Sequence, residues 1–120
     1  MRGQKKGSFL RTGSKPYEMG EFTQILASGR IKNDFCIRYV DFTSPSDISI
    51  YRLKLFSGEI GQEVLIGEFM INSENCIIDK NISIEAIIPV QKANSRISAR
   101  LASQNVKGSM NISLRIRLFS

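Results

Sequence analysis

The sequence contains no histidine and no tryptophan, and each absence narrows the chemistry that the protein can perform. Histidine is the commonest general base and a frequent metal ligand, so the usual catalytic triads and zinc sites lack a member. The only cysteines, Cys36 and Cys76, are far apart and form no Cys-x-x-Cys pair, which excludes a site of clustered thiolates. Whether they form a disulfide is left open, and two free buried thiols are the simpler interpretation.

Long apolar runs and paired acidic groups are also missing. No segment approaches the run of about 20 apolar residues that spans a membrane, and the basic N-terminus has no apolar stretch of the kind found in secretory signals. Three glutamates, Glu59, Glu63 and Glu68, are close in sequence, but Glu63 and Glu68 have opposite strand parity and face different sides. We therefore predict no catalytic residue, no metal, no cofactor and no membrane partner: the protein is not expected to be an enzyme.

What the sequence does contain is a strict alternation near its C-terminus. Large aliphatic side chains occupy every second position, and the positions between them are polar and include Arg115 and Arg117. The aliphatic residues are Met110, Ile112, Leu114, Ile116 and Leu118. Successive side chains of a β-strand point to opposite faces, so this pattern indicates a half-buried strand with one aliphatic and one polar face.

Similar patterns recur upstream and are separated by short polar turns. We expect strands at residues 31–42, 50–56, 63–70, 76–78, 82–88 and 96–102, with Gly67 marking a bulge or a close backbone approach. Residues 22–28 fit either a short strand or one helical turn. Seven or eight short strands without a convincing helix predict an all-β fold, an antiparallel β-sandwich or a small barrel.

The net charge of +6 is concentrated at the N-terminus, where residues 1–20 hold five basic residues against Glu18 and so carry +4. Their four glycines and scattered charge predict an extended arm, residues 1–20, attached to a β-sandwich domain, residues 21–120. The arm is expected to bind a partner through basic residues and apolar anchors. These candidates are Arg2, Lys5, Lys6, Phe9, Leu10, Arg11, Lys15 and Tyr17.

A second candidate surface is a basic sheet face. Arg96 and Arg100 share the outward parity of one expected strand, and Arg115 and Arg117 share that of the last one, so a hairpin of the two strands would gather four guanidinium groups. A solvated face is the simplest interpretation. A protein interface, or an OB-like barrel that binds nucleic acid, remains an alternative, although serine and asparagine stand where stacking aromatics would be needed. A carbohydrate-binding sandwich is a third alternative, disfavoured by the lack of tryptophan.

One stretch of the sequence resembles a known group of proteins. Residues 88–101, IPVQKANSRISARL, followed by a polar gap and an alternating C-terminal strand, resemble small β-sandwich virion structural proteins of tailed bacteriophages. The segments QILAS at residues 24–28 and GEIGQEVLI at residues 58–66 look similar to the same group, so that the resemblance covers about residues 21–119. Lys92-Ala93-Asn94 departs from the tight glycine turn that is usual there.

The resemblance implies a jelly-roll-like sandwich that forms part of a virus particle. The expected function is that of a non-enzymatic structural component, of the capsid decoration, head-fibre or tail-attached type, assembled in the host cytoplasm. It would dock on other virion proteins, capsid or tail subunits, through the sandwich and the basic arm, with nucleic acid an improbable partner. Self-association into a homo-oligomer, with a trimer favoured, would hide sheet edges.

Overall fold

The computed structural model describes residues 8–75, 82–105 and 107–119, and these form an all-β fold. The strands are β1 (Ser8–Arg11), β2 (Thr23–Leu26), β3 (Phe35–Thr43), β4 (Ile50–Ser57), β5 (Val64–Asn72), β6 (Ile82–Glu85), β7 (Ile97–Ser103) and β8 (Ser109–Leu118), with one 3₁₀ turn, η1 (Ser73–Asn75). The predicted β-sandwich is thereby confirmed, and residues 22–28 contain a strand. The expected strand at residues 76–78 lies outside the described residues. Within the described ranges no helix is long and apolar enough to cross a membrane.

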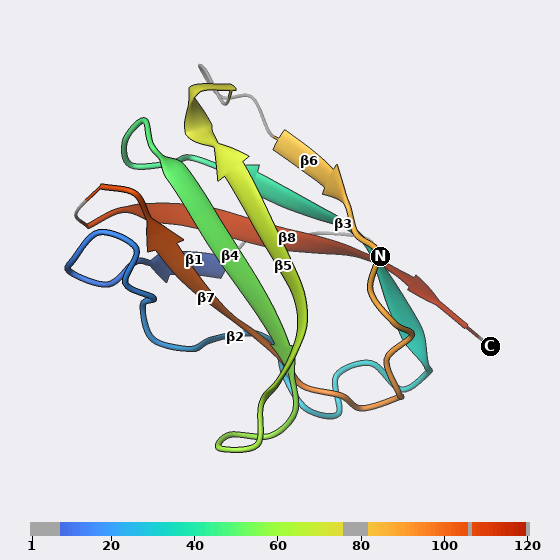
Figure 1. Ribbon diagram of the computed structural model, residues 1–120. Helices are drawn as coiled ribbons and strands as arrows, with labels where there is room; N and C mark the ends of the chain where they lie inside the picture. Colours follow the sequence, from blue (N-terminus) through green and yellow to red (C-terminus); the bar gives the residue numbers. More distant parts are fainter. Residues whose placement is uncertain (1–7, 76–81, 106, 120) are drawn as a thin grey trace.

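The strands form two four-stranded antiparallel sheets that pack face to face (Figure 1). The first sheet has the order β1-β8-β3-β6 and the second the order β2-β7-β4-β5. The first four strands therefore pair with the last four in reverse order, β1 with β8, β2 with β7, β3 with β6 and β4 with β5. The arrangement is that of one long hairpin rolled over on itself. The pairing of β3 with β8 completes the first sheet, and the pairing of β4 with β7 completes the second. Such a strand order defines a jelly roll.

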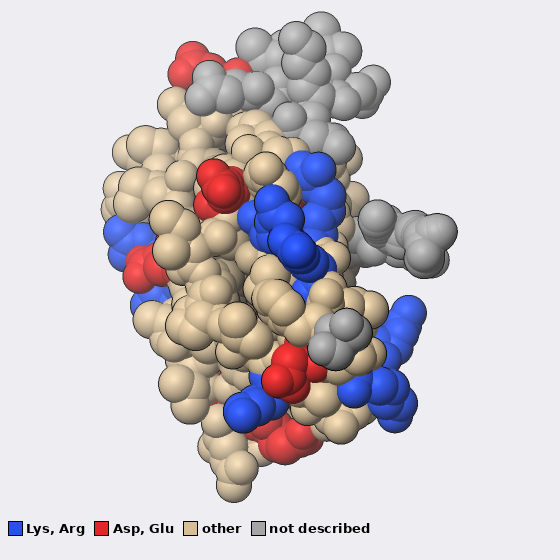
Figure 2. All heavy atoms as spheres, turned by 90° about the vertical axis from the view of Figure 1, so that its right-hand side faces the viewer, with Lys and Arg blue, Asp and Glu red and all other residues tan. Residues whose placement is uncertain are grey.

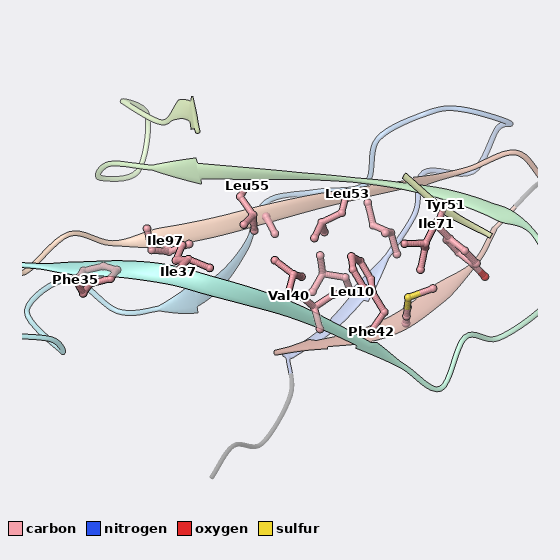
Figure 3. Close-up of a cluster of buried hydrophobic side chains, with 14 residues drawn as sticks. Leu10, Phe35, Ile37, Val40, Phe42, Tyr51, Leu53, Leu55, Ile71 and Ile97 are labelled. Atoms are coloured by element: carbon pink, nitrogen blue, oxygen red, sulfur yellow. The ribbon is translucent and has the colours of Figure 1, made fainter. Parts of the chain in front are cut away.

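Alternation along the strands generates the core between the sheets (Figure 3). On β8, Met110 and Ile112 are completely buried, opposite Leu10 on β1 and Phe42 on β3 respectively. The inward parity predicted for this strand is confirmed. Burial decreases toward its C-terminal end, where Leu114 and Ile116 only partly pack against the core and Leu118 is 54% exposed.

Gly67 marks both a bulge and a close approach, as its place inside an apolar strand predicts. The β4–β5 register shifts between Leu55, which faces Gly67, and Phe56, which faces Leu65. A Cβ at Gly67 would lie 3.1 Å from Cδ1 of Ile88, tighter than ordinary van der Waals contact. The glycine therefore leaves room for the Ile88 side chain, from the segment after β6, beside β5.

The predicted division into an arm, residues 1–20, and a sandwich is wrong for the part of the arm that the structure describes. Ser8–Arg11 form β1 at the edge of the first sheet, and Leu10 is 1% exposed among the core side chains. Further along, the N–H of Gly20 donates to the carbonyl of Leu101, 2.8 Å away. The composition concealed this strand because four residues offer only two inward positions, too few for a recognisable period.

Candidate binding site

The predicted basic face does not exist as one surface, because its two strands do not form a hairpin. β8 pairs with β1 and β3 in the first sheet, whereas β7 pairs with β2 and β4 in the second. Arg100 therefore lies on the opposite side of the sandwich from Arg115 and Arg117. The side of the molecule seen in Figure 2 likewise shows basic and acidic side chains interspersed, with uncharged surface between them.

Arg96, expected at the surface, is buried in a polar contact between three segments. It is 6% exposed, and its Nε donates to Oε1 of Gln24 at 2.8 Å. Its Nη1 donates to the carbonyl of Gly58 at 3.2 Å and lies 3.4 Å from Oε2 of Glu63, which is itself largely buried. Outward parity placed this side chain correctly on the outer face, but the β4–β5 loop covers that part of the face. Arg96 is thus a structural residue.

The two arginines of β8 behave differently from each other. Arg115 donates through Nε and Nη2 to both carboxylate oxygens of Asp41, at 3.1 Å each. Its guanidinium carbon lies 4.4 Å from the centre of the Tyr39 ring. Arg117 is exposed and has no ion-pair partner in the described part of the chain. Of the four predicted basic residues, it is the one whose charge remains available at the surface.

Three residues that the sequence placed on separate surfaces meet in one hollow beside the β1–β2 connection. Phe9 and Arg11 come from the predicted arm and Arg100 from the predicted basic face. Phe22 completes the set, and sequence analysis did not single it out. The hollow has a volume of about 520 Å³ and is lined by Phe9, Arg11, Thr12, Gly13, Glu18, Met19, Gly20, Glu21, Phe22, Thr23 and Arg100.

Local hydrogen bonds hold the connection that forms this hollow. The Glu18 carboxylate accepts from the backbone N–H groups of Ser14, at 2.8 Å, and Lys15, at 3.2 Å. The bond from Ser14 is the main cause that lowers the pKa of Glu18 below its ordinary value. A Cβ at Gly20 would collide with the carbonyl oxygen of Arg11, so only glycine allows the return of the chain past β1.

Arg100 fixes the far wall of the hollow. Its Nε donates to the carbonyl of Gly20 at 2.7 Å, and its guanidinium carbon lies 5.0 Å from the centre of the Phe22 ring. Phe22 in turn packs edge-on against Phe56, with ring centres 4.9 Å apart. The Arg100 guanidinium is therefore engaged by the Gly20 carbonyl and the Phe22 ring, whereas the Phe22 side chain remains 41% exposed to solvent.

The hollow offers apolar surface beside one available positive charge. Phe9 is 52% exposed, and the guanidinium carbon of Arg11 lies 5.4 Å from the centre of its ring. The hydroxyl of Thr12 is already used, since it accepts from the N–H of Gly108 at 2.8 Å. The exposed carboxylate of Glu21 also lines the hollow, so the lining carries both signs of charge and is suited mainly to binding an apolar side chain against Phe9 and Phe22.

The remaining arm candidates have different positions. Lys15 and Tyr17 are exposed on the β1–β2 connection, and Tyr17 lines a smaller hollow of about 90 Å³ on the outer face of the second sheet, together with Met70 on β5. Leu10, expected to be an anchor for a partner, is instead buried in the core of this chain. Arg2, Lys5 and Lys6 lie outside the described residues.

A buried polar cluster at one end of the sandwich was missed by sequence analysis. The Tyr51 hydroxyl donates to Oδ1 of Asp47 at 2.5 Å, and the hydroxyls of Ser49 and Ser103 lie 2.8 Å apart. The Ser73 hydroxyl donates to the Asp47 carbonyl at 2.9 Å. Burial, and then the bond to Asp47, raises the pKa of Tyr51 to about 12. The cluster ties three loops together; its only signal in the sequence was the polar turn before β4.

No group of three or more His, Cys, Asp or Glu side chains that could hold a metal ion occurs in residues 8–75, 82–105 and 107–119. Cys36, on β3, is a free, half-buried thiol, and Cys76 lies outside the described residues. No protein-family model matches the sequence, and no curated protein is significantly similar to it.

Proposed function

We propose that the protein is a non-enzymatic structural component of a bacteriophage virion, which docks on capsid or tail subunits. The jelly-roll strand order supports this class, because double-sheet jelly rolls recur in viral capsid proteins. This support is an analogy at the level of the fold, and lectin domains share the same architecture.

The observation that carries the proposal is the apolar edge formed by β5, beside which no further strand pairs in the part of the chain that the structure describes. This nine-residue strand ends the second sheet, and Val64 is 64%, Leu65 48% and Met70 58% exposed. A long edge strand with exposed aliphatic side chains is prone to pairing with other chains, and monomeric proteins usually protect such edges with charges or a short strand. In an assembled particle, subunit contacts would cover it.

Self-association through β5 explains this edge, and a closed homo-oligomer, a trimer, is the state that we favour. In a closed ring, the β5 edge of each subunit contacts a different surface of its neighbour, so every β5 edge is buried and none is left free for further growth. The hollow of Phe9, Arg11 and Phe22 is on the opposite side of the second sheet's strand order, beside β2, so it stays available for a second type of partner. We assign this hollow to contact with a neighbouring virion protein.

The oligomer is tested by sedimentation velocity on the purified full chain. The wild type should sediment as a trimer, and Leu65→Lys should sediment as a monomer because a charge on β5 opposes edge pairing. Val90→Lys is the matched control, since Val90 is 56% exposed outside β5 and should leave the trimer intact. A wild type that stays monomeric at high concentration would contradict this part of the proposal.

The virion role is tested on particles purified by density gradient from the phage that carries this chain. Mass spectrometry should detect its peptides at a fixed ratio to the major capsid protein. Phe9→Ala should reduce incorporation, whereas Phe119→Ala, a change at another exposed phenylalanine outside the hollow, should not. Particles that lack the chain, or equal incorporation of both variants, would count against the role or the docking hollow respectively.

A second candidate function, nucleic-acid binding, is favoured by one specific observation. The alternation in the sequence predicts no aromatic residues beside the basic ones, yet Arg100 lies against Phe22 and Arg115 against Tyr39. The OB-like form of this alternative is excluded because the sheets form a jelly roll. Single-stranded DNA binding whose affinity falls linearly with the logarithm of salt concentration, together with normal particles lacking the chain, would favour this candidate.

A further inference from the structure

The strand β8 is only partly covered along the edge that faces β1. It has ten residues, and β1 pairs with four of them, from Ser109 to Ile112. β3 covers the opposite edge of β8 as far as Leu118. Within the described residues, no strand pairs with residues 113–118 on the β1 side. Among the described residues, the backbone edge of these six residues of β8 is therefore unpaired on this side.

A groove between the sheets accompanies this free edge. Its volume is about 120 Å³, and it is lined by Ser8, Ile25, Leu26, Ile112, Ser113, Leu114 and Ile116. On the β3 side, Leu114 pairs with Val40 and Ile116 with Ile37. Val40 and Ile37 are buried, whereas Leu114 and Ile116 are only partly buried. Their unburied flank is the one that an additional strand beside β8 would cover.

The two faces of residues 113–118 have different chemistry. Leu114 and Ile116 point toward the groove, whereas Arg115 and Arg117 lie on the outer face, and Arg117 has no ion-pair partner among the described side chains. A strand added here would place alternate side chains next to the aliphatic pair and the others next to the arginines, because side chains alternate with period two.

We propose that this edge of β8 binds an extended segment of a partner protein in which apolar side chains alternate with acidic ones. The apolar residues fill the groove beside Leu114 and Ile116. The acidic ones lie on the outer face, where Arg115 is already bound to Asp41 and Arg117 supplies the available positive charge. Main-chain hydrogen bonds to residues 113–118 give affinity, and the alternation gives specificity, as in other cases of β-strand addition. The site is separate from the β5 edge and does not depend on the virion role.

A second copy of the chain fits this edge poorly. In antiparallel pairing, residues directly opposite each other point to the same face. The registers that overlap most of residues 113–118 therefore set Arg115 opposite either Arg115 or Arg117 of the second copy. Like charges in directly opposite positions are destabilising, so self-pairing is disfavoured here.

The chain's own first residues also have the wrong chemistry for this edge. Ser8 pairs with Ile112, so an extension of the same register would set Lys6 against Leu114 and Lys5 against Arg115. The first places an ammonium group at an apolar position, and the second opposes two positive charges. An acidic and apolar partner segment satisfies both faces.

The experiment measures fluorescence anisotropy of two labelled, capped heptapeptides with the full chain. In one, valine alternates with glutamate; in the other, valine alternates with lysine. The glutamate peptide should bind at least tenfold more tightly, and its affinity should fall as salt is raised. NMR amide shifts should locate the bound peptide at residues 113–118.

Charge reversal at the site provides the sharper test. Arg117→Glu should weaken binding of the glutamate peptide at least tenfold and strengthen binding of the lysine peptide. Lys107→Glu makes the same change in charge at the other end of β8, about 30 Å away along the strand, and should leave both affinities unchanged. Far-UV circular dichroism should confirm that both variants fold as the wild type does.

Three results would overturn the proposal. The first is that the full chain binds neither peptide, or binds both equally. The second is that the Arg117→Glu variant keeps the wild-type preference for the glutamate peptide, as the Lys107→Glu control is expected to do. The third is that the peptide binds only after residues 1–7 are removed, which would mean that the chain's own N-terminus occupies the edge.

Discussion

The buried contact between Arg96 and Glu63 allows a quantitative test of the fold. Arg96→Met keeps most of the aliphatic stem but removes the charge and three hydrogen bonds, those to Gln24, Gly58 and Glu63. Since the Glu63 side chain is only 9% exposed, its carboxylate would then be left without its buried partner. Breaking a buried pair in this way typically costs about 3–5 kcal/mol of unfolding free energy.

The pair of Arg52 and Glu68 is the matched control. Its Nε–Oε2 distance is 3.2 Å, shorter than the 3.4 Å of the buried pair, but its side chains are 45% and 42% exposed. Solvent screens an exposed pair, so Arg52→Met should cost less than about 1 kcal/mol. If distance alone governed the energy, the control would be the more damaging change.

Urea unfolding followed by far-UV circular dichroism gives both free energies, because the chain has no tryptophan to report the transition. The cycle is completed by Glu63→Gln and the double variant. The double variant should lose less than the sum of the single losses, since no unpaired charge remains buried. Equal losses for Arg96→Met and Arg52→Met, with an unchanged m-value, would refute the assignment of Arg96 as a buried structural residue.

Three further predictions concern the core and the polar cluster. Leu10→Ala should lower the free energy of unfolding in urea by about 2–5 kcal/mol because Leu10 is buried. An unchanged urea midpoint would mean that Leu10 lies outside the core, as expected for an extended arm. Ile112→Ala should likewise cost about 2–5 kcal/mol, and Leu118→Ala on the same face much less, because Leu118 is 54% exposed; the reverse order would mean that β8 packs in another register. The pKa of Tyr51 rises from its ordinary value of 10 to about 12 on folding, so its contribution to stability is complete below pH 10 and is lost as the pH rises through 12. Tyr51→Phe should therefore reduce the alkaline loss of stability in a pH series of urea midpoints, and an identical pH profile would contradict the raised pKa.

The strands and their faces were predictable because alternation is a local property. Ile112 and Arg117 could be assigned to opposite faces of β8 from the sequence alone, and the structure agrees. The glycine inside β5 likewise marked a bulge at the correct place. β1 was missed, since a strand of four residues with Leu10 as its single buried aliphatic residue leaves no periodic signal.

The candidate hollow could not be predicted, because it is formed by residues far apart in the chain. Phe9 and Arg100 were each identified as candidates, but on different surfaces, and Phe22 was not identified. The signal that would have suggested their meeting, the close return of the chain at Gly20, depends on β1 being part of the sheet. Without that strand, the connection resembles an unstructured arm.

The sequence by itself determined the all-β class, most strand positions and the direction of most side chains, because these follow from period two and from turn chemistry. Which strands become neighbours was decided only by the tertiary structure. β7 and β8 follow each other in sequence, yet they lie in different sheets because both sheets must bury an apolar face and the rolled hairpin pairs strands from opposite ends of the chain. That pairing separates Arg100 from Arg117 and buries Arg96 beneath a loop. Side-chain direction is a local property, but exposure and proximity are consequences of long-range packing.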